Sequence, residues 1–427
     1  MDQPFVILTA ARLIDGLGGP PIEDAAILID GETIRAVGRR SEVRAPDGAT
    51  ATVVEHGDAT LMPGLADGHT HLAAPGDGTR GDVIGAETEA FLLVRAAANA
   101  AAALRSGVTT LRENGSKGRV AFELREAIRR GVTPGPRMII CGRPVTITGG
   151  HLHFFGGETN GVEGVRQTIR QLVKEGADFV KIVSSGGSTR SSHPYRPAFT
   201  PAELAAIADE THRFGKLCAA HSVPNQAISD CLDAGVDMII HGNMSDETGR
   251  YVYRPDLTER IVAQGAWVNP TMHDIRAWIG HYAGVREANG GTLSAEDQAG
   301  LDGIQRFYDE KVDAVRRFHE AGAKLMAGSD SPWGQFKPGT GWQEIDAFTD
   351  AGLSNAAAIV TGTSGSAEAI GVGDIAGRLA AGRQADILVV PGDPYADLHV
   401  LGRPLAVYQA GRAVAGVGGG AGGGRPA

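Results

Sequence analysis

The sequence has few cysteines and no long apolar segment, and both absences restrict the class of protein. Three cysteines, Cys141, Cys218 and Cys231, lie far apart and form no CxxC pair. A disulfide framework is therefore excluded, and we expect small core residues in a reducing compartment. No stretch could span a bilayer, and the first residues, MDQPFVILTAARLIDG, lack the basic and then apolar arrangement of a secretory signal. We expect a cytoplasmic protein without membrane contact.

An excess of basic charge is also absent. The chain has 40 Lys and Arg against 50 Asp and Glu, a net charge of −10. This balance gives no electrostatic attraction to nucleic acid. With 427 residues, 42% of them hydrophobic, the chain is long enough to bury a large core. We therefore expect a small-molecule substrate as partner, and the composition is compatible with a homo-oligomer.

Both ends of the chain carry strand patterns. FVILTAARLIDG and AAILIDGETIRAVG near the start alternate apolar and polar residues around Asp-Gly turns, and ADILVVPGD and PLAVYQAGRAV near the end are similar. Because chain ends often meet in a folded domain, we predict one small β-sandwich from residues 1–58 and 376–415. The glycine-rich residues 416–427 are predicted to be disordered.

The middle of the chain, residues 59–375, alternates strand-like and helix-like runs. Eight strand-like runs start at Leu61, Val108, Arg137, Phe179, Leu217, Met238, Trp267 and Leu325. One helix-like run begins at Thr200-Pro201, a favourable helix start. Eight such units predict an α/β protein with a (β/α)8 barrel of the TIM type. The polar, glycine-containing segment from His273 to Thr292 is predicted to be a lid loop or an insertion.

Polar residues stand where the predicted strands end. His69 and His71 are two apart in GHTH and would face one side of a strand. Later strands end at His221, His241 and Asp330. Because the carboxyl ends of barrel strands converge on one site, four histidines and a carboxylate form a binding set for zinc, manganese or cobalt. A lone HxH is a weak signal, but four such strand ends in order make a structural role a poor explanation.

Several segments resemble the amidohydrolase superfamily over nearly the whole chain. PGLADGHTHL, KIVSSGG, AAHS, IIHGN and AGSD occur in that superfamily's order. GVTTLRENG, GGH and KIVSSGG are similar to its imidazolonepropionase- and prolidase-like branch. The resemblance implies one or two divalent metals, zinc above all, and a CO2-derived carbamate on Lys181 that bridges them. The implied metal ligands are His69, His71, Lys181, His221, His241 and Asp330. The alternative for Lys181 is an ordinary surface lysine, but within FVKIV a charged lysine would be costly to bury unless modified or paired.

The same resemblance implies residues that contact the substrate. His151, in GGH, would contact the substrate carbonyl and act as an electrophile. The loops after the strands add His153, Arg190, His193, Tyr195, His273 and Trp333 as predicted substrate-binding residues. Prolidase-like relatives carry an aromatic hydroxyl just after the fifth-strand histidine, whereas this sequence has Ser222-Val223. Glu113 stands where relatives usually have Asp.

These residues predict a metal-dependent hydrolase that cleaves an amide, urea or carbamate C–N bond of a small molecule. A metal-activated water would attack the carbonyl, and Asp330 would carry the water proton to the leaving nitrogen. One alternative is an Xaa-Pro or N-acyl dipeptidase or a cyclic-amide hydrolase, and Val223 argues against the dipeptidase. The other alternative is a non-catalytic barrel scaffold, which the complete ligand set disfavours.

Overall fold

Strands from both ends of the chain pair within one sheet. The computed structural model describes residues 5–417, and its largest sheet has eight strands in the order β16-β15-β14-β5-β1-β2-β3, with β4 paired to β1. The bounds are β1 Phe5–Leu13, β2 Ile22–Asp30, β3 Thr33–Arg39, β4 Ala51–Glu55, β5 Ala59–Pro63, β14 Ile387–Pro391, β15 Ala406–Gln409 and β16 Arg412–Ala413. Strand β14 runs antiparallel to β5 and so joins the two ends. Most of the predicted disordered tail lies outside the described residues.

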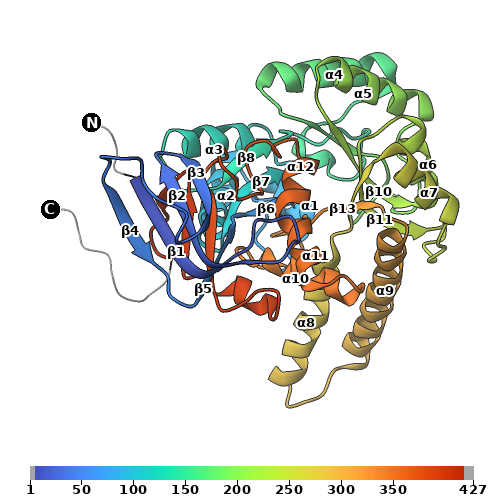
Figure 1. Ribbon diagram of the computed structural model, residues 1–427. Coiled ribbons are helices and arrows are strands. Elements are labelled where there is room, and N and C mark those ends of the chain that lie inside the picture. The colour runs from blue at the N-terminus through green and yellow to red at the C-terminus, as the bar shows by residue number, and fades with distance from the viewer. Residues whose placement is uncertain (1–4, 418–427) are drawn as a thin grey trace.

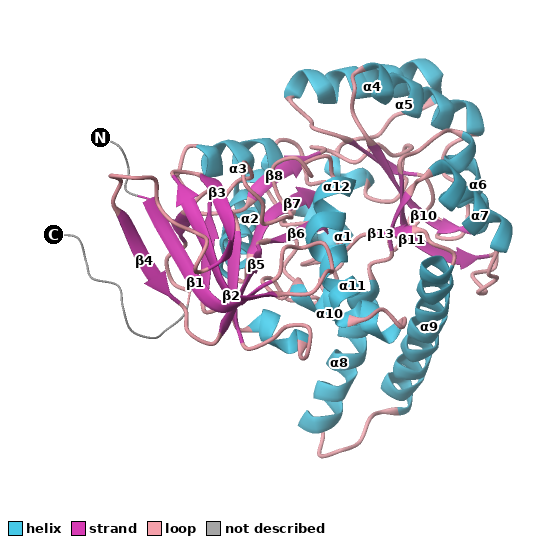
Figure 2. Cartoon of the chain, viewed as in Figure 1, coloured by secondary structure: helices cyan, strands magenta, loops and turns pink. Residues whose placement is uncertain are grey.

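The middle of the chain forms two parallel sheets (Figures 1 and 2). One has the order β6-β7-β8 and the other β13-β12-β11-β10-β9. The bounds are β6 Leu65–Thr70, β7 Val108–Glu113, β8 Arg137–Ile140, β9 Val180–Val183, β10 Cys218–Pro224, β11 Met238–Ser245, β12 Trp267–Asn269 and β13 Lys324–Leu325. Each of the eight predicted strand runs contains or adjoins one of these strands. This mixed α/β arrangement with parallel sheets fits a TIM-like barrel.

Helices connect the parallel strands. They are α1 Gly81–Ala86, α2 Glu89–Arg105, α3 Val120–Arg129, α4 Gly161–Glu175, α5 Pro201–Arg213, α6 Asn225–Asp233, α7 Pro255–Gln264, α8 Met272–Ala288, α9 Ala295–Glu320, α10 Trp342–Asp350, α11 Asn355–Val360 and α12 Ser366–Ala369. Short helical turns cover η1 His153–Phe155, η2 Thr361–Gly365 and η3 Leu398–Gly402. Helix α5 starts where the sequence predicted, because Thr200 and Glu203 form a reciprocal capping box.

The prediction of a loop between His273 and Thr292 is wrong. Residues Met272–Ala288 form helix α8, which pairs with the long helix α9 in a hairpin that projects from the rest of the molecule (Figure 1). Apolar residues at Ile275, Ile279 and Tyr282 recur three and four apart, a helical spacing that the intervening polar residues and glycines obscured. Packing against α9 outweighs the low helix propensity of these glycines.

The sequence also predicted buried, unpaired cysteines and the absence of a membrane-spanning segment. All three cysteines are buried and free, as predicted for core residues. Within residues 5–417, no helix combines the length and the apolar character that crossing a membrane requires.

Candidate active site

A cavity of about 480 Å³ lies where the parallel strands end. Its wall includes every residue that the sequence predicted as a metal ligand: His69, His71, Lys181, His221, His241 and Asp330. They come from β6, β9, β10, β11 and the segment after β13. The structure therefore brings the whole set together, and their role as ligands stays a prediction.

The ligand atoms of three of these residues lie close together. The distance from His69 Nε2 to Asp330 Oδ1 is 3.3 Å, and that from His71 Nε2 to the same oxygen is 3.5 Å. Lys181 Nζ lies 3.1 Å from His69 Nε2. The backbone is strained here, because His241 and Asp330 adopt φ angles of 68° and 62° without being glycine. Strain of this kind, which costs about 1–3 kcal/mol per residue, is concentrated at functional sites.

Each histidine of the set uses one ring nitrogen to hold its orientation. The amide nitrogen of Asn269 donates to Gly328 O, and this bond fixes the orientation of the amide group. Its oxygen Oδ1 therefore faces His69 and accepts from His69 Nδ1 at 2.9 Å. His71 Nδ1 donates to the carbonyl of Gly115 at 2.8 Å. These bonds fix the tautomer and leave the unprotonated Nε2 of both rings toward the cavity.

The other two histidines of the set are held in the same way. His241 Nδ1 lies 2.8 Å from Thr271 Oγ1, whose own proton goes to Pro270 O. His221 reverses the pattern, because its Nε2 donates to Gly186 O at 3.0 Å and leaves Nδ1 free. All four rings therefore offer a lone pair, which is the arrangement that a metal site requires.

Burial sets the protonation of these groups. It lowers the pKa of His71 and His221 to about 3 and the pKa of His69 and His241 well below the ordinary range. Four neutral imidazoles beside one carboxylate fit a divalent cation of the zinc type, because imidazole ligates in its neutral form.

Burial also shifts the pKa values of Lys181 and Asp330, the two members of the set that are not histidines. Burial lowers the pKa of Lys181 to about 7. Burial raises the pKa of Asp330 to about 6, although the positive charge of Lys181 acts in the opposite direction. Both groups therefore change protonation close to neutral pH, which suits acid–base chemistry.

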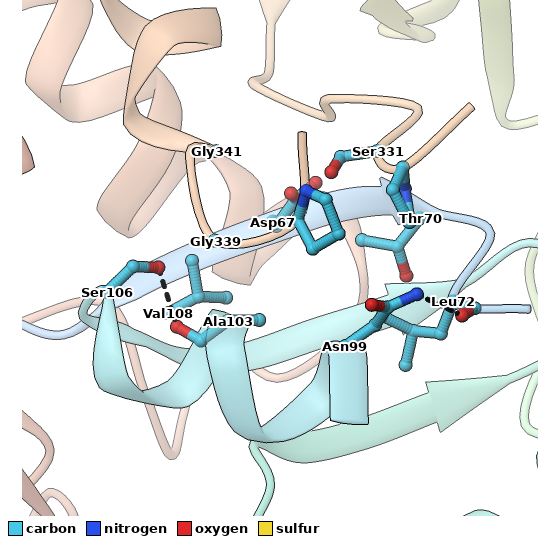
Figure 3. Close-up of a pocket in the computed structure, with 12 residues that line it drawn as sticks. Asp67, Thr70, Leu72, Asn99, Ala103, Ser106, Val108, Ser331, Gly339 and Gly341 are labelled. Carbon is cyan, nitrogen blue, oxygen red and sulfur yellow. Dashed lines mark hydrogen bonds between the residues drawn. The ribbon is translucent and has the colours of Figure 1, made fainter. Parts of the chain in front are cut away.

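Asp67 is part of strand β6, two residues before His69, and its carboxylate joins this strand to the segment that carries Asp330. Its Oδ1 accepts the N–H of His69 at 3.1 Å and that of Ser329 at 2.9 Å. Figure 3 shows Asp67 beside Asn99 and Ser331 at a second cavity, of about 10 Å³. That volume holds about one water molecule, so no substrate fits there.

Three of the predicted substrate-binding residues line the large cavity. They are His151, Tyr195 and Trp333. The His151 ring lies 4.7 Å from that of His221, and its Nδ1 lies 2.8 Å from Thr189 Oγ1. The Trp333 ring lies 5.4 Å from that of His71.

The remaining predicted substrate-binding residues lie elsewhere. His153, Arg190 and His193 are not part of the wall of the large cavity. His273 lines a separate groove between α8 and α10, where its Nδ1 accepts from Arg276 and its ring packs on Phe336. His273 therefore lies outside the cavity that the predicted metal ligands line. A role for these four residues in substrate binding stays a prediction.

The α8–α9 hairpin contributes a wall of the cavity that the sequence did not predict. Asp274, Ile275 and Trp278 of α8 and Phe307 and Lys311 of α9 all line the cavity. Burial and the charge of Asp330 raise the pKa of Asp274, and burial lowers that of Lys311 to about 7. The predicted loop concealed α8. On α9 the sequence carries one signal, because Lys311 stands in the apolar stripe that Tyr308, Val315 and Phe318 form at helical spacing.

A second group of potential metal ligands lies at the amino ends of β10 and β11. His212 Nε2 and Cys218 Sγ approach Asp237 Oδ2 to 2.9 and 3.4 Å. Burial and the Asp237 charge raise the pKa of the Cys218 thiol well above its ordinary value. A thiol must lose its proton to bind a metal, so this group is better explained as a hydrogen-bonded cluster.

Comparison with known proteins agrees with this geometry. Residues 60–414 match the amidohydrolase family, and the chain belongs to that family. It is 26% identical to ochratoxinase from Aspergillus niger, over 95% of this chain and 85% of that protein. It is 24% identical to imidazolonepropionase from Streptomyces griseus subsp. griseus, over 92% of this chain and 93% of that protein.

The fold is also similar to solved structures. A Xaa-Pro dipeptidase with methionine in its active site superposes with a TM-score of 0.80 at 25% identity, over 96% of this chain and 99% of that one. Family and relatives together show that the chain is a hydrolase acting on C–N bonds. The predicted superfamily is thus confirmed.

We predict that the purified protein holds about one to two equivalents of divalent metal. His71→Ala should lose at least one of them, because it removes a preoriented imidazole from the cluster. Elemental analysis measures the metal content. Thermal unfolding provides a second readout, since a ligand that binds only the folded state raises Tm and its removal by a chelator lowers Tm.

The matched control is His212→Ala, which alters the second cluster and should leave metal content unchanged. A metal-free protein with full activity, or His71→Ala with its full complement of metal, would contradict the assignment.

Proposed function

We propose that the chain hydrolyses an amide, urea or carbamate C–N bond in a small molecule at the cavity around Asp330. One observation carries this proposal: four neutral imidazoles, each oriented by a hydrogen bond to its other nitrogen, surround Asp330 and Lys181 in one cavity. A divalent metal bound there would acidify a water molecule and polarise the substrate carbonyl. Zinc suits the nitrogen-rich donor set, and manganese or cobalt would also bind.

Lys181 is proposed to carry a carbamate formed from CO2. Only a neutral amine attacks CO2, and burial lowers the pKa of Lys181 to about 7, so a neutral fraction exists at physiological pH. The carbamate would place a negative charge among the imidazoles and so complete a site for two cations. Asn114 Oδ1, 3.5 Å from Lys181 Nζ, could accept a hydrogen bond from the carbamate N–H.

Asp330 is proposed to transfer protons. Its carboxylate would take the proton of the attacking water and release it to the leaving nitrogen, which departs poorly without protonation. Burial favours the protonated form of Asp330, since it raises the pKa of this carboxyl group above its ordinary value. His151, held at Nδ1 by Thr189, would donate from its other ring nitrogen to the substrate carbonyl oxygen.

The cavity wall favours a substrate with an aromatic or aliphatic group. Tyr195, Trp278, Phe307 and Trp333 contribute aromatic surface, and Ile275 contributes aliphatic surface. Burying such a group gains about 25 cal/mol for each Å² of apolar area.

Dipeptide hydrolysis is the second candidate. The structural similarity to a Xaa-Pro dipeptidase supports it. Val223, which lines the cavity, offers no hydroxyl at the place where prolidase-like relatives carry one, and this disfavours it. The similarity to imidazolonepropionase supports a cyclic-amide hydrolase to a similar degree, because an imidazolone is a cyclic amide. The described residues give no support to a scaffold.

We also propose how the chain is divided into domains. Two isolated β-bridges, both parallel, connect the two parallel sheets. They pair Thr70 with Ser331 and Val145 with Ile182, and they support a closed barrel over residues 59–375. The eight-stranded sheet supports a β-sandwich from residues 1–58 and 376–415. A cytoplasmic location and a homo-oligomer remain predictions.

A panel of N-acyl amino acids, aryl ureas and carbamates tests the proposed reaction. We expect metal-loaded protein to hydrolyse at least one class, as followed by release of the amine. A chelator should abolish the turnover, and zinc, manganese or cobalt should restore it. Metal-loaded, folded protein that hydrolyses none of the three classes would refute the proposal.

Asp330→Asn keeps the size of the side chain and removes the proton carrier. We expect kcat to fall by about a hundredfold or more, with the fold retained as judged by circular dichroism. The control Asp302→Asn, on the exposed face of α9, should change kcat little. Activity of Asp330→Asn close to that of the wild type would exclude Asp330 from proton transfer.

Lys181→Ala removes the proposed bridge. It should lose at least one metal equivalent and nearly all activity, and a short carboxylic acid added to the variant should restore part of both. Lys174→Ala, on the exposed side of α4, is the control and should behave as the wild type. If Lys181→Ala keeps its metal and its turnover, the bridging role and the binuclear site are wrong.

A further inference from the structure

We propose that Asp274 recognises a protonated amino group of the substrate. The preferred substrates would then be amides, ureas or carbamates that carry an amine close to the scissile bond, beside an aromatic or aliphatic group. The identity of the cleaved bond in this inference rests on the proposed function.

Asp274 has an acceptor atom that the protein leaves unused. It lies in the first turn of α8 and lines the same cavity as Asp330. Its Oδ1 is buried and accepts no hydrogen bond within the described part of the chain, while the residue as a whole is partly exposed. In its ionised form this carboxyl group only accepts, and an unpaired buried carboxylate is costly, so a ligand that stabilises the ionised form must supply a donor.

Two charged groups that lie near Asp274 are already engaged, namely Lys311 in the same wall and Glu344 behind it. Lys311 on α9 donates to His241 O and Pro270 O, both at 2.8 Å, and to Asn243 Oδ1, so its three protons are used. Glu344 of α10 accepts the N–H groups of Met272 and His273, one on each oxygen. In the hairpin wall, Asp274 is therefore the group that can still form a hydrogen bond to a ligand, through its Oδ1.

The surroundings of Asp274 favour a cation over a neutral donor. Trp278, one turn further along α8, and Trp333 line the cavity beside it, and aromatic faces attract cations. A charged donor also forms a stronger hydrogen bond to a carboxylate than a neutral one does. Because burial and Asp330 raise the pKa of Asp274, a bound ammonium would restore its charged form.

The loop after Asp330 packs closely against this carboxylate. A Cβ atom placed at Gly334 would lie 2.8 Å from Asp274 Oδ1 and 3.1 Å from Trp278 Nε1, and Gly334 has a φ of +57°. Any larger residue would collide with the carboxyl group. The group is therefore held in a defined place, as recognition requires.

A matched pair of substrates tests the inference. Phenylalanine anilide carries a free ammonium, and N-acetylphenylalanine anilide does not. With metal-loaded wild type we expect kcat/KM for the ammonium substrate to exceed that for the acetylated one by at least about tenfold. Asp274→Asn should lower kcat/KM for the ammonium substrate by about tenfold or more, chiefly through KM, and change the acetylated substrate less than about threefold. Asp309→Asn, exposed on α9, is the control and should change neither.

Two results would overturn the inference. Equal losses on both substrates in Asp274→Asn would indicate a structural role, and a wild-type preference for the acetylated substrate would indicate that the carboxyl group donates rather than accepts.

If the metal-loaded wild type hydrolyses neither compound, calorimetric binding of 2-phenylethylamine and its N-acetyl derivative decides the role of Asp274 without turnover. Binding of the amine that Asp274→Asn weakens by at least about tenfold supports recognition, and equal binding by wild type and variant refutes it. Failure of the panel described above, by contrast, concerns the cleaved bond alone.

Discussion

The carboxylate of Asp67 holds strand β6 against the segment that carries Asp330, and the geometry of the cavity depends on this contact. Asp67 accepts hydrogen bonds from the backbone of His69 and from both the backbone and the hydroxyl of Ser329. As a result, atoms of His69, His71 and Asp330 lie within 4.8 Å of one another, although the chain between them runs through the whole barrel region. The contact is buried, so its hydrogen bonds act without competition from water.

Several ionisable side chains are buried near this contact. The positive charges of the lysines offset part of the cost of burying the Asp330 carboxylate. Lys181, Asp330 and Lys311 are all nearly inaccessible to solvent. Burying any one of these charges alone would be costly. Burial disfavours the charged form of each group and shifts its pKa accordingly. A divalent cation bound by the imidazoles and the carboxylate would stabilise the folded state, because the unfolded chain offers no such site.

The α8–α9 hairpin gives the cavity a character of its own. The parallel strands and the segment after β13 supply the imidazoles and Asp330, whereas the hairpin adds aromatic surface and the Asp274 carboxyl group. Lys311 links the two parts, because its hydrogen bonds to His241 O and Pro270 O brace the strained ends of β11 and β12. The same helix therefore supports His241, a proposed metal ligand, and borders the cavity.

The sequence by itself determined the eight parallel strands and the six residues proposed as ligands. Their apolar runs and polar ends are local patterns, and His69-x-His71 carries its geometry in the two-residue period of a strand. Only the tertiary structure decided which atoms orient each ring, since Asn269 and Thr271 reach His69 and His241 from other strand ends. Helix α8 was also decided by the tertiary structure, because its apolar periodicity is weak and packing against α9 stabilises it. The role of Asp274 likewise depends on the tertiary structure, because the cavity wall joins residues that are distant in the chain.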